Sequence, residues 1–324
     1  MAESGGELME AVMFRRITLL AAFFLMTAGL RAQTATNLAV GSVAAQWLDI
    51  AGSARIEGLG EAYVAVADDA NALGVNPAGL GKITGTEIAL THDSYIQGAD
   101  IEQGRGSFAL GPGNVGVGLT YGNFGNVEQY TVNNGTPVDG GAYQPMVWKM
   151  DLGYGLSLMP DIYAGLSVKY LMDDITSTQL TGWAFDAGGL WTPKATNFTV
   201  GLSVLNMGTL AGSAIPTEVR GGASYKLDIT GDPQNIHTLL VSLDALARTV
   251  SLSSNREAVG LEYSYHDKLF LRVGQALTDT TGLSGWSGFS AGVGIEFDKI
   301  KLDYAYANLA DLGTINMISI ASDF

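Results

Sequence analysis

The chain has 324 residues, of which 47% are hydrophobic, 43 are Gly and 8 are Pro, and its formal net charge is −15. The absence of Cys excludes disulfides, thiolate metal sites, a lipoprotein anchor and a Cys nucleophile. The acidic balance argues against nucleic acid as a partner, because a phosphate-binding surface needs clustered Lys and Arg. No run after residue 30 reaches the roughly 18 apolar residues that a membrane helix needs. The chain is therefore either a packed soluble protein or a barrel whose apolar residues are spread in alternation.

Residues 1–32 have the pattern of a cleaved export signal. Arg15 and Arg16 supply a positive start, an apolar stretch follows, and Ala32 ends a small-residue cleavage site. Residues 1–12 are an upstream extension, because Met13 would begin a more usual signal. The alternative, an uncleaved anchor helix, is disfavoured because the apolar core is too short. We expect the mature protein to be exported.

Residues 33–83 follow no strand pattern and are marked by small residues. These small residues let the backbone pack closely against another part of the chain; they are Gly58, Gly60, Ala62, Ala65 and Ala67. The sequence Asn76-Pro77-Ala78-Gly79 has turn chemistry, with Asn first, Pro fixing φ next and Gly last.

Two adjacent carboxylates, Asp68 and Asp69, precede a short helical turn predicted over residues 70–73. Asp69 is expected to cap this turn by accepting hydrogen bonds from its free backbone amides. The alternative is that the pair binds a divalent cation, which we consider the less frequent use of such a pair.

From about residue 84 to Phe324 the chain alternates apolar residues with small or polar ones. In one segment Val115, Val117 and Leu119 alternate with Gly116 and Gly118. Because successive side chains on a strand point to opposite faces, each segment has one apolar face. About fourteen strands are predicted, over 86–95, 102–110, 114–122, 145–158, 161–171, 182–192, 197–206, 216–227, 238–246, 256–265, 268–276, 286–297, 299–307 and 314–324.

The connections between these strands alternate between short turns and long links. Outer-membrane barrels have this asymmetry, with short periplasmic turns and longer outside loops, and an even strand count leaves both termini periplasmic. The link 228–237 departs from this alternation, because it is long where a short periplasmic turn is expected. The long link 122–144 is a candidate partner loop through Tyr130, Asn133, Asn134 and Tyr143. A plain exposed hairpin extension explains it equally well.

If the apolar faces meet lipid, the opposite faces collect charge inside the barrel. The expected interior charges are Asp151, Lys169, Asp186, Arg220, Lys226, Asp244, Glu262, Arg272, Glu296, Lys301 and Asp303. Arg placed at Val117 should then be costly, whereas Ser at inward-facing Gly118 should be mild.

A soluble β-sandwich is the alternative fold. Two features disfavour it: the less apolar face is rich in Gly and Ala, and the last strand carries Ile318 and Ile320 and ends on Phe324. Such an ending resembles the signal read by the outer-membrane barrel assembly machinery. The fold prediction is all-β, a transmembrane antiparallel barrel over 84–324.

The segment before the barrel resembles the N-terminal signature of the PorV/PorQ family, within the FadL-like group of fourteen-stranded outer-membrane barrels. The matching residues are Ala54, Arg55, Gly58, Gly60, Ala62, Ala65, Ala67, Asp68, Asp69, Ala72, Asn76, Pro77, Ala78, Gly79 and Leu80. The chain departs from the family at Gly74-Val75, where an aromatic pair is usual. The resemblance implies that residues 33–83 enter the barrel from the periplasm and plug it, in the outer membrane of a diderm bacterium.

The sequence offers no catalytic constellation. The three His are His92, His237 and His266, without the spacing of a zinc site. No nucleophile elbow leads from a strand into a helix, and Gly58-x-Gly60 lacks the third Gly of a phosphate-binding loop. We expect no enzyme activity and no cofactor.

Two functions remain open. The PorV/PorQ resemblance implies an accessory or shuttle component in type IX-like protein secretion and surface attachment, whose partners would be a secretion-system barrel or a secreted client protein. The FadL-like resemblance implies instead a transporter whose ligand is a hydrophobic small molecule such as a long-chain fatty acid. A purely structural barrel is a third reading.

Overall fold

The computed structural model describes residues 43–133, 135–175, 178–194, 196–230, 236–248, 255–277 and 287–324. These residues belong to one compact unit, Asn37–Phe324. The predicted export signal, 1–32, and the first ten residues of the predicted plug, 33–42, lie outside the described residues.

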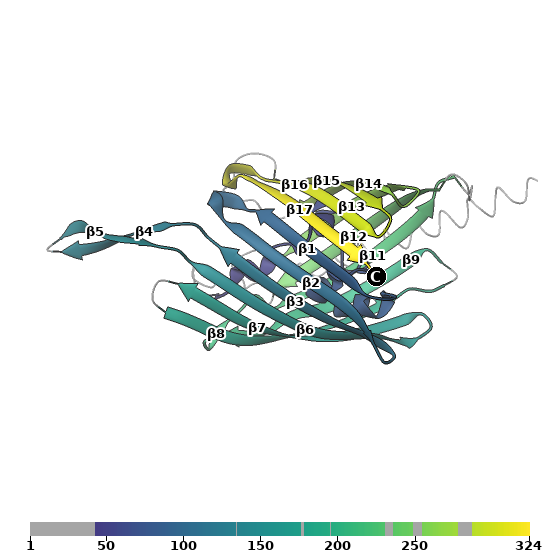
Figure 1. The fold of residues 1–324 in the computed structure, drawn as a ribbon, viewed down its shortest axis with the longest axis horizontal. Helices are drawn as coiled ribbons and strands as arrows, with labels where there is room; N and C mark the ends of the chain where they lie inside the picture. Colours follow the sequence, from purple (N-terminus) through teal and green to yellow (C-terminus); the bar gives the residue numbers. More distant parts are fainter. Residues whose placement is uncertain are drawn as a thin grey trace, which may run out of the picture. The chain divides into compact units, whose positions relative to one another are not determined.

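Fourteen antiparallel strands of the described chain close into a barrel (Figure 1). Each strand pairs with its neighbours in the sequence, and the last strand pairs with the first, so that the ring has no free edge. The strands are β1 (Glu87–Ser94), β2 (Asp100–Leu110), β3 (Gly113–Asn123), β6 (Met146–Met159), β7 (Ile162–Ile175), β8 (Thr178–Trp191), β9 (Phe198–Leu210), β11 (Glu218–Asp228), β12 (His237–Arg248), β13 (Arg256–Tyr265), β14 (Leu269–Leu277), β15 (Ser287–Phe297), β16 (Ile300–Leu309) and β17 (Thr314–Asp323). The prediction of an all-β, fourteen-stranded antiparallel barrel is confirmed.

The barrel has two distinct ends. We call the end that carries the link between β3 and β6 the loop end. The opposite end, where Phe324 N–H donates to Thr86 O at 2.8 Å, is the terminal end. Short 3-10 helices η4 (Ile96–Gly98) and η5 (Ala310–Leu312) connect strands at the loop end, and the two-residue β10 (Ser213–Ala214) pairs with β9.

Three strands run further toward the loop end than the sequence predicted. β7 ends at Ile175 and β8 begins at Thr178, so the link predicted over 172–181 is much shorter than expected. β9 ends at Leu210 and β11 begins at Glu218, so the link predicted over 207–215 is only slightly shorter. The extra residues include a polar run that lacks the alternation marking strands whose one face is apolar.

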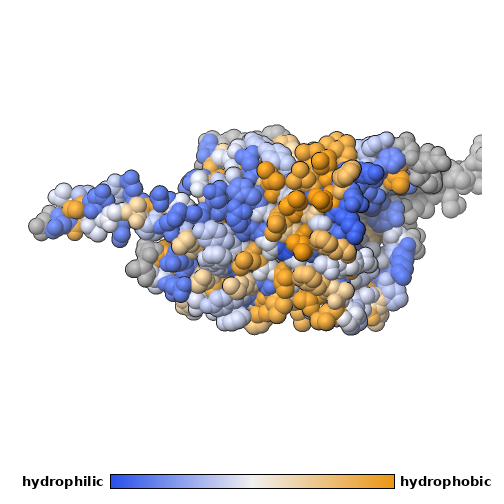
Figure 2. Space-filling model, in the orientation of Figure 1, coloured by the Kyte–Doolittle hydropathy of each residue, from blue (hydrophilic) through white to orange (hydrophobic). Residues whose placement is uncertain are grey.

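The apolar faces point outward, as predicted. Val117 and Leu119 of β3 are 40% and 44% exposed and face outward. Thr120, the next residue along the strand, is 6% exposed and faces inward. Figure 2 shows the hydrophobic residues gathered in a band across the strands, with hydrophilic residues toward both ends. An outer-membrane barrel needs such a band to match the hydrocarbon layer.

Four short helices lie in residues 43–83, which we call the inner segment: η2 (Gln46–Asp49), α2 (Ala54–Gly58), α3 (Ala72–Val75) and η3 (Pro77–Lys82). Helix α2 begins where the Ser53 side chain accepts a hydrogen bond from Ile56 N. Asn76 caps η3 in the same way through Ala78 N, with Pro77 in the first turn. The predicted turn at Asn76–Gly79 is therefore the capped start of a 3-10 helix.

The predicted cap at Asp69 is wrong in position. α3 begins at Ala72, and its N-cap is Asn71, whose side chain makes no capping bond. Asp69 Oδ1 instead accepts from Asn71 N at 2.9 Å, just before the helix. Local side-chain to backbone bonds of this kind compete with a helix start, which explains the shift.

The link 122–144 contains a hairpin of β4 (Val127–Asn133) and β5 (Thr136–Tyr143), which pair only with each other. It projects beyond the barrel strands at the loop end (Figure 1). The described residues of β4 are all exposed. An isolated two-stranded hairpin is at best marginally stable in water, so it lacks the support that the barrel strands have.

Candidate functional site

The inner segment packs against inward-facing glycines of the strands. A Cβ on Gly165 of β7 would meet the Pro77 backbone, and a Cβ on Gly274 of β14 would meet Gly60 N, both closer than any real contact. Gly60 also has φ +62, a backbone conformation that favours glycine. A Cβ at Gly79 would lie 2.6 Å from Ala67 O. The Gly-rich inner face is therefore where two backbones approach each other.

This packing also corrects the expectation for Gly118. A Cβ there would lie 2.9 Å from Asp151 Oδ2 and 3.3 Å from Leu73 Cδ2 of the inner segment. Ser at Gly118 is therefore not a mild change. A Cβ at Gly58 would lie 3.3 Å from Arg272 Cβ and 3.3 Å from Gly292 Cα, which is also a tight approach.

Asn76 joins the inner segment to the wall and is fully buried. Its Nδ2 donates to Val64 O at 3.0 Å and to Gly189 O of β8 at 3.2 Å, while Oδ1 accepts from Ala78 N at 3.2 Å. One side-chain amide thus makes hydrogen bonds to the inner segment, to strand β8 of the barrel wall and to the first turn of η3. A buried amide with its hydrogen bonds made in this way specifies one arrangement.

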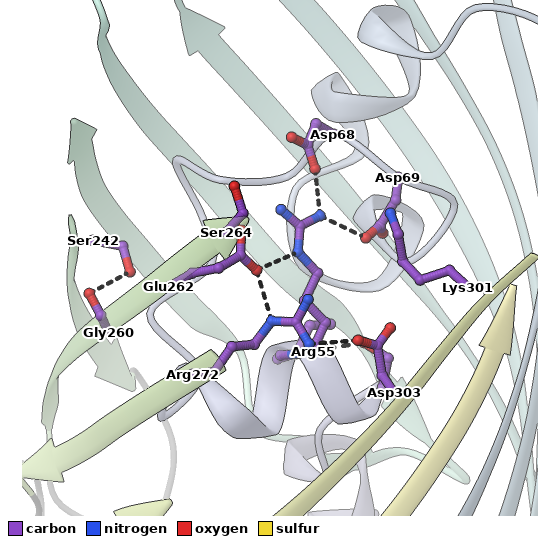
Figure 3. A network of polar contacts seen from close by, with 12 residues as sticks. Arg55, Asp68, Asp69, Ser242, Gly260, Glu262, Ser264, Arg272, Lys301 and Asp303 are labelled. Carbon is purple, nitrogen blue, oxygen red and sulfur yellow. Dashed lines mark hydrogen bonds and ion pairs between the residues drawn. The ribbon is translucent and has the colours of Figure 1, made fainter. Parts of the chain in front are cut away.

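An ion-pair cluster ties the inner segment to strands β13 and β14 (Figure 3). Arg55 of α2 contacts Asp68 at 2.7 Å, Asp69 at 3.0 Å and Glu262 of β13 at 3.2 Å. Arg272 of β14 shares the same Glu262 oxygen at 2.6 Å. From the sequence, Arg55 was identified only as a residue of the family motif. Its ion-pair partner Glu262 lies 207 residues further along the chain.

The electrostatics of this cluster favour the charged forms. Burial lowers the pKa of Arg55, but the carboxylates of Asp68 and Glu262 outweigh it and raise that pKa well above its usual value. Partial desolvation raises the pKa of Asp68, whose side chain is 42% exposed, but the Arg55 guanidinium more than offsets this and the pKa is lowered. Asp68 and Asp69 are thus occupied by Arg55. Among the described residues no group of His, Asp and Glu has the arrangement of a metal site.

Further inward-facing polar side chains hold the backbone of the inner segment. Asp244 Oδ2 accepts from Tyr63 N and Val64 N, both at 2.8 Å. Three such hydrogen bonds from side chains of β2 and β3 were not predicted from the sequence. Gln103 donates to Ala51 O, Arg105 donates to Gly52 O, and Asn114 donates to Leu80 O. Their place on the inward side of the alternation was the only signal of this role.

The predicted interior charges are mostly buried. Exposure is 8% or less for Asp151, Lys169, Asp186, Arg220, Asp244, Glu262, Arg272 and Asp303. Lys226 is instead exposed, and Glu296 and Lys301 are only partly buried. All three lie near the terminal end of their strands, where the interior opens to water.

One buried carboxylate of the inner segment stands in an acidic surrounding. Burial raises the pKa of Glu57 to about 8, helped by the carboxylates of Glu61 and Asp93 and opposed by Arg256. Asp93 of β1 is fully buried, and its carboxylate oxygens have no hydrogen-bond partner among the described residues. Glu61 is held by Arg256 of β13.

The predicted partner-loop and assembly residues lie at opposite ends of the barrel. Tyr130 of β4 is 62% exposed, and its hydroxyl donates to Glu128 Oε2 at 2.7 Å. Asn133 and Tyr143 lie at the far and near ends of the hairpin, and Asn134 lies outside the described residues. Of the last strand, Ile318 and Ile320 face outward, and Phe324 at the terminal end is 68% exposed.

Comparison with known proteins places the fold. A family model described as "Uncharacterised protein family (UPF0164)" matches residues 24–143. Among solved structures, the Pseudomonas putida toluene transporter TodX aligns with a TM-score of 0.57 at 13% identity, over 84% of this chain and 97% of that one. The Ralstonia pickettii toluene transporter TbuX gives 0.55 at 13% identity, over 85% and 99%.

A Pseudomonas aeruginosa FadL homologue gives a TM-score of 0.50 at 12% identity, over 84% of this chain and 98% of that one. No curated protein matches the chain. At such identities the likeness shows the fold alone, an antiparallel β-barrel like those of these solved structures. No helix in the described part of the chain is both long and apolar enough to cross a membrane.

Proposed function

We propose that this protein is a non-enzymatic outer-membrane barrel of PorV/PorQ type that acts as an accessory or shuttle in protein secretion and surface attachment. The observation that carries the proposal is the fixed, ion-paired interior, combined with a working surface that projects from the loop end. A cleaved export signal, periplasmic termini and insertion by the barrel assembly machinery belong to the same proposal.

The interior supports a role that does not depend on conduction. The inner segment is bonded to β13 through Arg55 and to β8 through Asn76, and its backbone lies against strand glycines. A cavity of about 20 Å³ beside η2 has room for roughly one water, and it borders Arg105, Lys149 and Lys169. Ligand sites for hydrophobic molecules are mostly apolar, unlike this one.

The hairpin supports a role in docking. Val132 is 75% exposed and Tyr130 is 62% exposed, on a hairpin that nothing else in the described chain covers. Tyr130 lies opposite Asp139, and no Lys or Arg occurs in 123–145. An aromatic side chain between carboxylates suits a basic polypeptide segment, through charge pairing and cation–π contact.

The test compares three strains: wild type, a gene deletion, and a strain whose barrel lacks Val127–Tyr143. Proteomics of the cell-surface fraction should show the same cargo lost from both mutants. The hairpin deletion must keep its heat-modifiable barrel in the outer membrane, which separates loss of docking from loss of folding. If the gene deletion leaves the surface cargo unchanged, the proposed role in secretion is refuted.

Transport of hydrophobic small molecules is the second candidate. It is favoured by the likeness in fold to proteins described as toluene transporters. Conduction would require the inner segment to move, and thus to break its contacts with the wall. Uptake of labelled toluene and of a labelled long-chain fatty acid, measured in cells with and without the protein, decides this. Uptake equal to that of the vector control would exclude transport of these ligands.

A further inference from the structure

A groove of about 410 Å³ runs along the outer wall where β17, β1, β2 and β3 lie side by side. The groove exists because one of the four outward-facing residues that lie side by side across these strands, which we call a row, is a glycine without a side chain. Cross-strand pairing places Ile320, Leu90, Gly104 and Leu119 in this row. The three apolar side chains are 44% to 55% exposed, and Gly104 leaves the space between Leu90 and Leu119 open.

The next row toward the loop end is polar at the same place. It reads Ile318, His92, Glu102 and Tyr121 across the same strands. His92 Nδ1 lies 2.7 Å from Glu102 Oε1, and the two side chains are 46% and 54% exposed on the lipid-facing side. Charged groups on this face of a barrel are costly unless they lie near the membrane interface. His92 and Glu102 each lie two residues from the loop end of their strand, at the level expected for lipid head groups.

The groove is closed toward the barrel interior. The β1–β2 and β2–β3 ladders run in unbroken register behind it. Behind the wall, Thr91 Oγ1 lies 2.8 Å from Ser319 Oγ, and Gln103 Nε2 donates to Ala51 O at 2.7 Å. Whatever occupies the groove therefore stays on the membrane side of the wall.

We propose that the groove binds one acyl chain of a phospholipid whose head group carries an ammonium. The chain lies over Gly104, and the ammonium pairs with Glu102. A void in a lipid-facing wall forfeits dispersion contacts, which an acyl chain restores. The volume falls within the roughly 300–1,000 Å³ of small-ligand sites.

Charge complementarity selects the head group. Glu102 is the acidic residue of the groove lining, and Asp100 is exposed two residues further along β2 toward the loop end. Within the lining the single basic partner is His92, already paired with Glu102. An anionic head group would face two carboxylates, whereas an ammonium complements them. This inference rests on the membrane location in the proposed function but not on the secretion role.

The test is native mass spectrometry of the delipidated full chain in detergent. The probes are phosphatidylethanolamine and phosphatidylglycerol with identical acyl chains. We expect one phosphatidylethanolamine to bind wild type about tenfold more tightly than phosphatidylglycerol. Glu102→Gln should abolish this preference, and Gly104→Leu should weaken phosphatidylethanolamine binding about tenfold by filling the groove.

Gly189→Leu on β8 is the matched control. A Cβ at Gly189 would meet nothing nearer than Tyr163 O at 3.9 Å, and one at Gly104 would meet only Leu90 Cδ2 at 3.4 Å, so both variants should fold. Heat-modifiable migration on gels checks the folding of each. Wild-type affinity in Gly104→Leu, or equal binding of the two lipids to wild type, would overturn the proposal.

Discussion

Replacing Arg55 by Met tests whether the ion-pair cluster holds the inner segment in the barrel. The change removes contacts to Asp68, Asp69 and Glu262. Breaking a fully buried pair costs about 3–5 kcal/mol. The cost here is lower, because Asp68 is 42% exposed and Glu262 keeps Arg272 at 2.6 Å. We therefore expect a loss of about 2–3 kcal/mol.

The assay is urea unfolding of the barrel refolded in lipid vesicles, followed by Trp fluorescence, together with limited proteolysis of residues 43–83. The variant should unfold at lower urea and expose the inner segment to protease. Glu296→Gln is the control, because the Glu296–Lys301 pair spans 3.4 Å and its side chains are about 30% exposed. Such a pair contributes at most about 1 kcal/mol. If both variants unfold within about 0.5 kcal/mol of wild type, Arg55 does not hold the segment.

Three further predictions use the same unfolding assay. Val117→Arg in the apolar band should cost about 2–4 kcal/mol, whereas Val132→Arg on the water-exposed hairpin should cost under about 0.5 kcal/mol; equal losses would contradict the assignment of the lipid face. Gly165→Val should block closure of the barrel around the inner segment, whereas outward-facing Gly189→Val should refold normally, and normal refolding of both would exclude the close approach seen at Gly165. Glu57 has a pKa raised from 4.5 to about 8, so its contribution is fully present below about pH 4.5 and is lost as the pH rises to about 8. Glu57→Gln should remove this decline, up to about 1.4 kcal/mol per pH unit, and parallel pH profiles for the two proteins would refute it.

The inner segment and the barrel wall depend on each other. Inward-facing glycines leave no side chains to fill the interior, and the inner segment supplies backbone and small residues instead. Its polar backbone groups are in turn bonded by strand side chains such as Asp244 and Gln103. A barrel of this sequence without the segment would leave buried charges such as Glu262 with fewer partners, at a cost in stability.

The sequence by itself determined the strand count, the alternation of faces and the ring of antiparallel neighbours. These follow from a period of two residues, which is a local property, and from the demand of lipid for apolar side chains on every outward position. The small residues between Gly58 and Gly79 also indicated that this segment packs closely against another part of the chain. The loop ends of β7, β8 and β9 escaped prediction, because their residues do not alternate between apolar and polar side chains.

Only the tertiary structure decided which inward residues meet the inner segment. Arg55 finds Glu262 across 207 residues, Asn76 finds Gly189 across 113, and Gly118 lies against Leu73, none of which any local pattern encodes. The path of the inner segment is set by the sum of these long-range contacts, each of which depends on all the others. The gap at Gly104 is of the same kind, because it arises only when four strands align their rows in register.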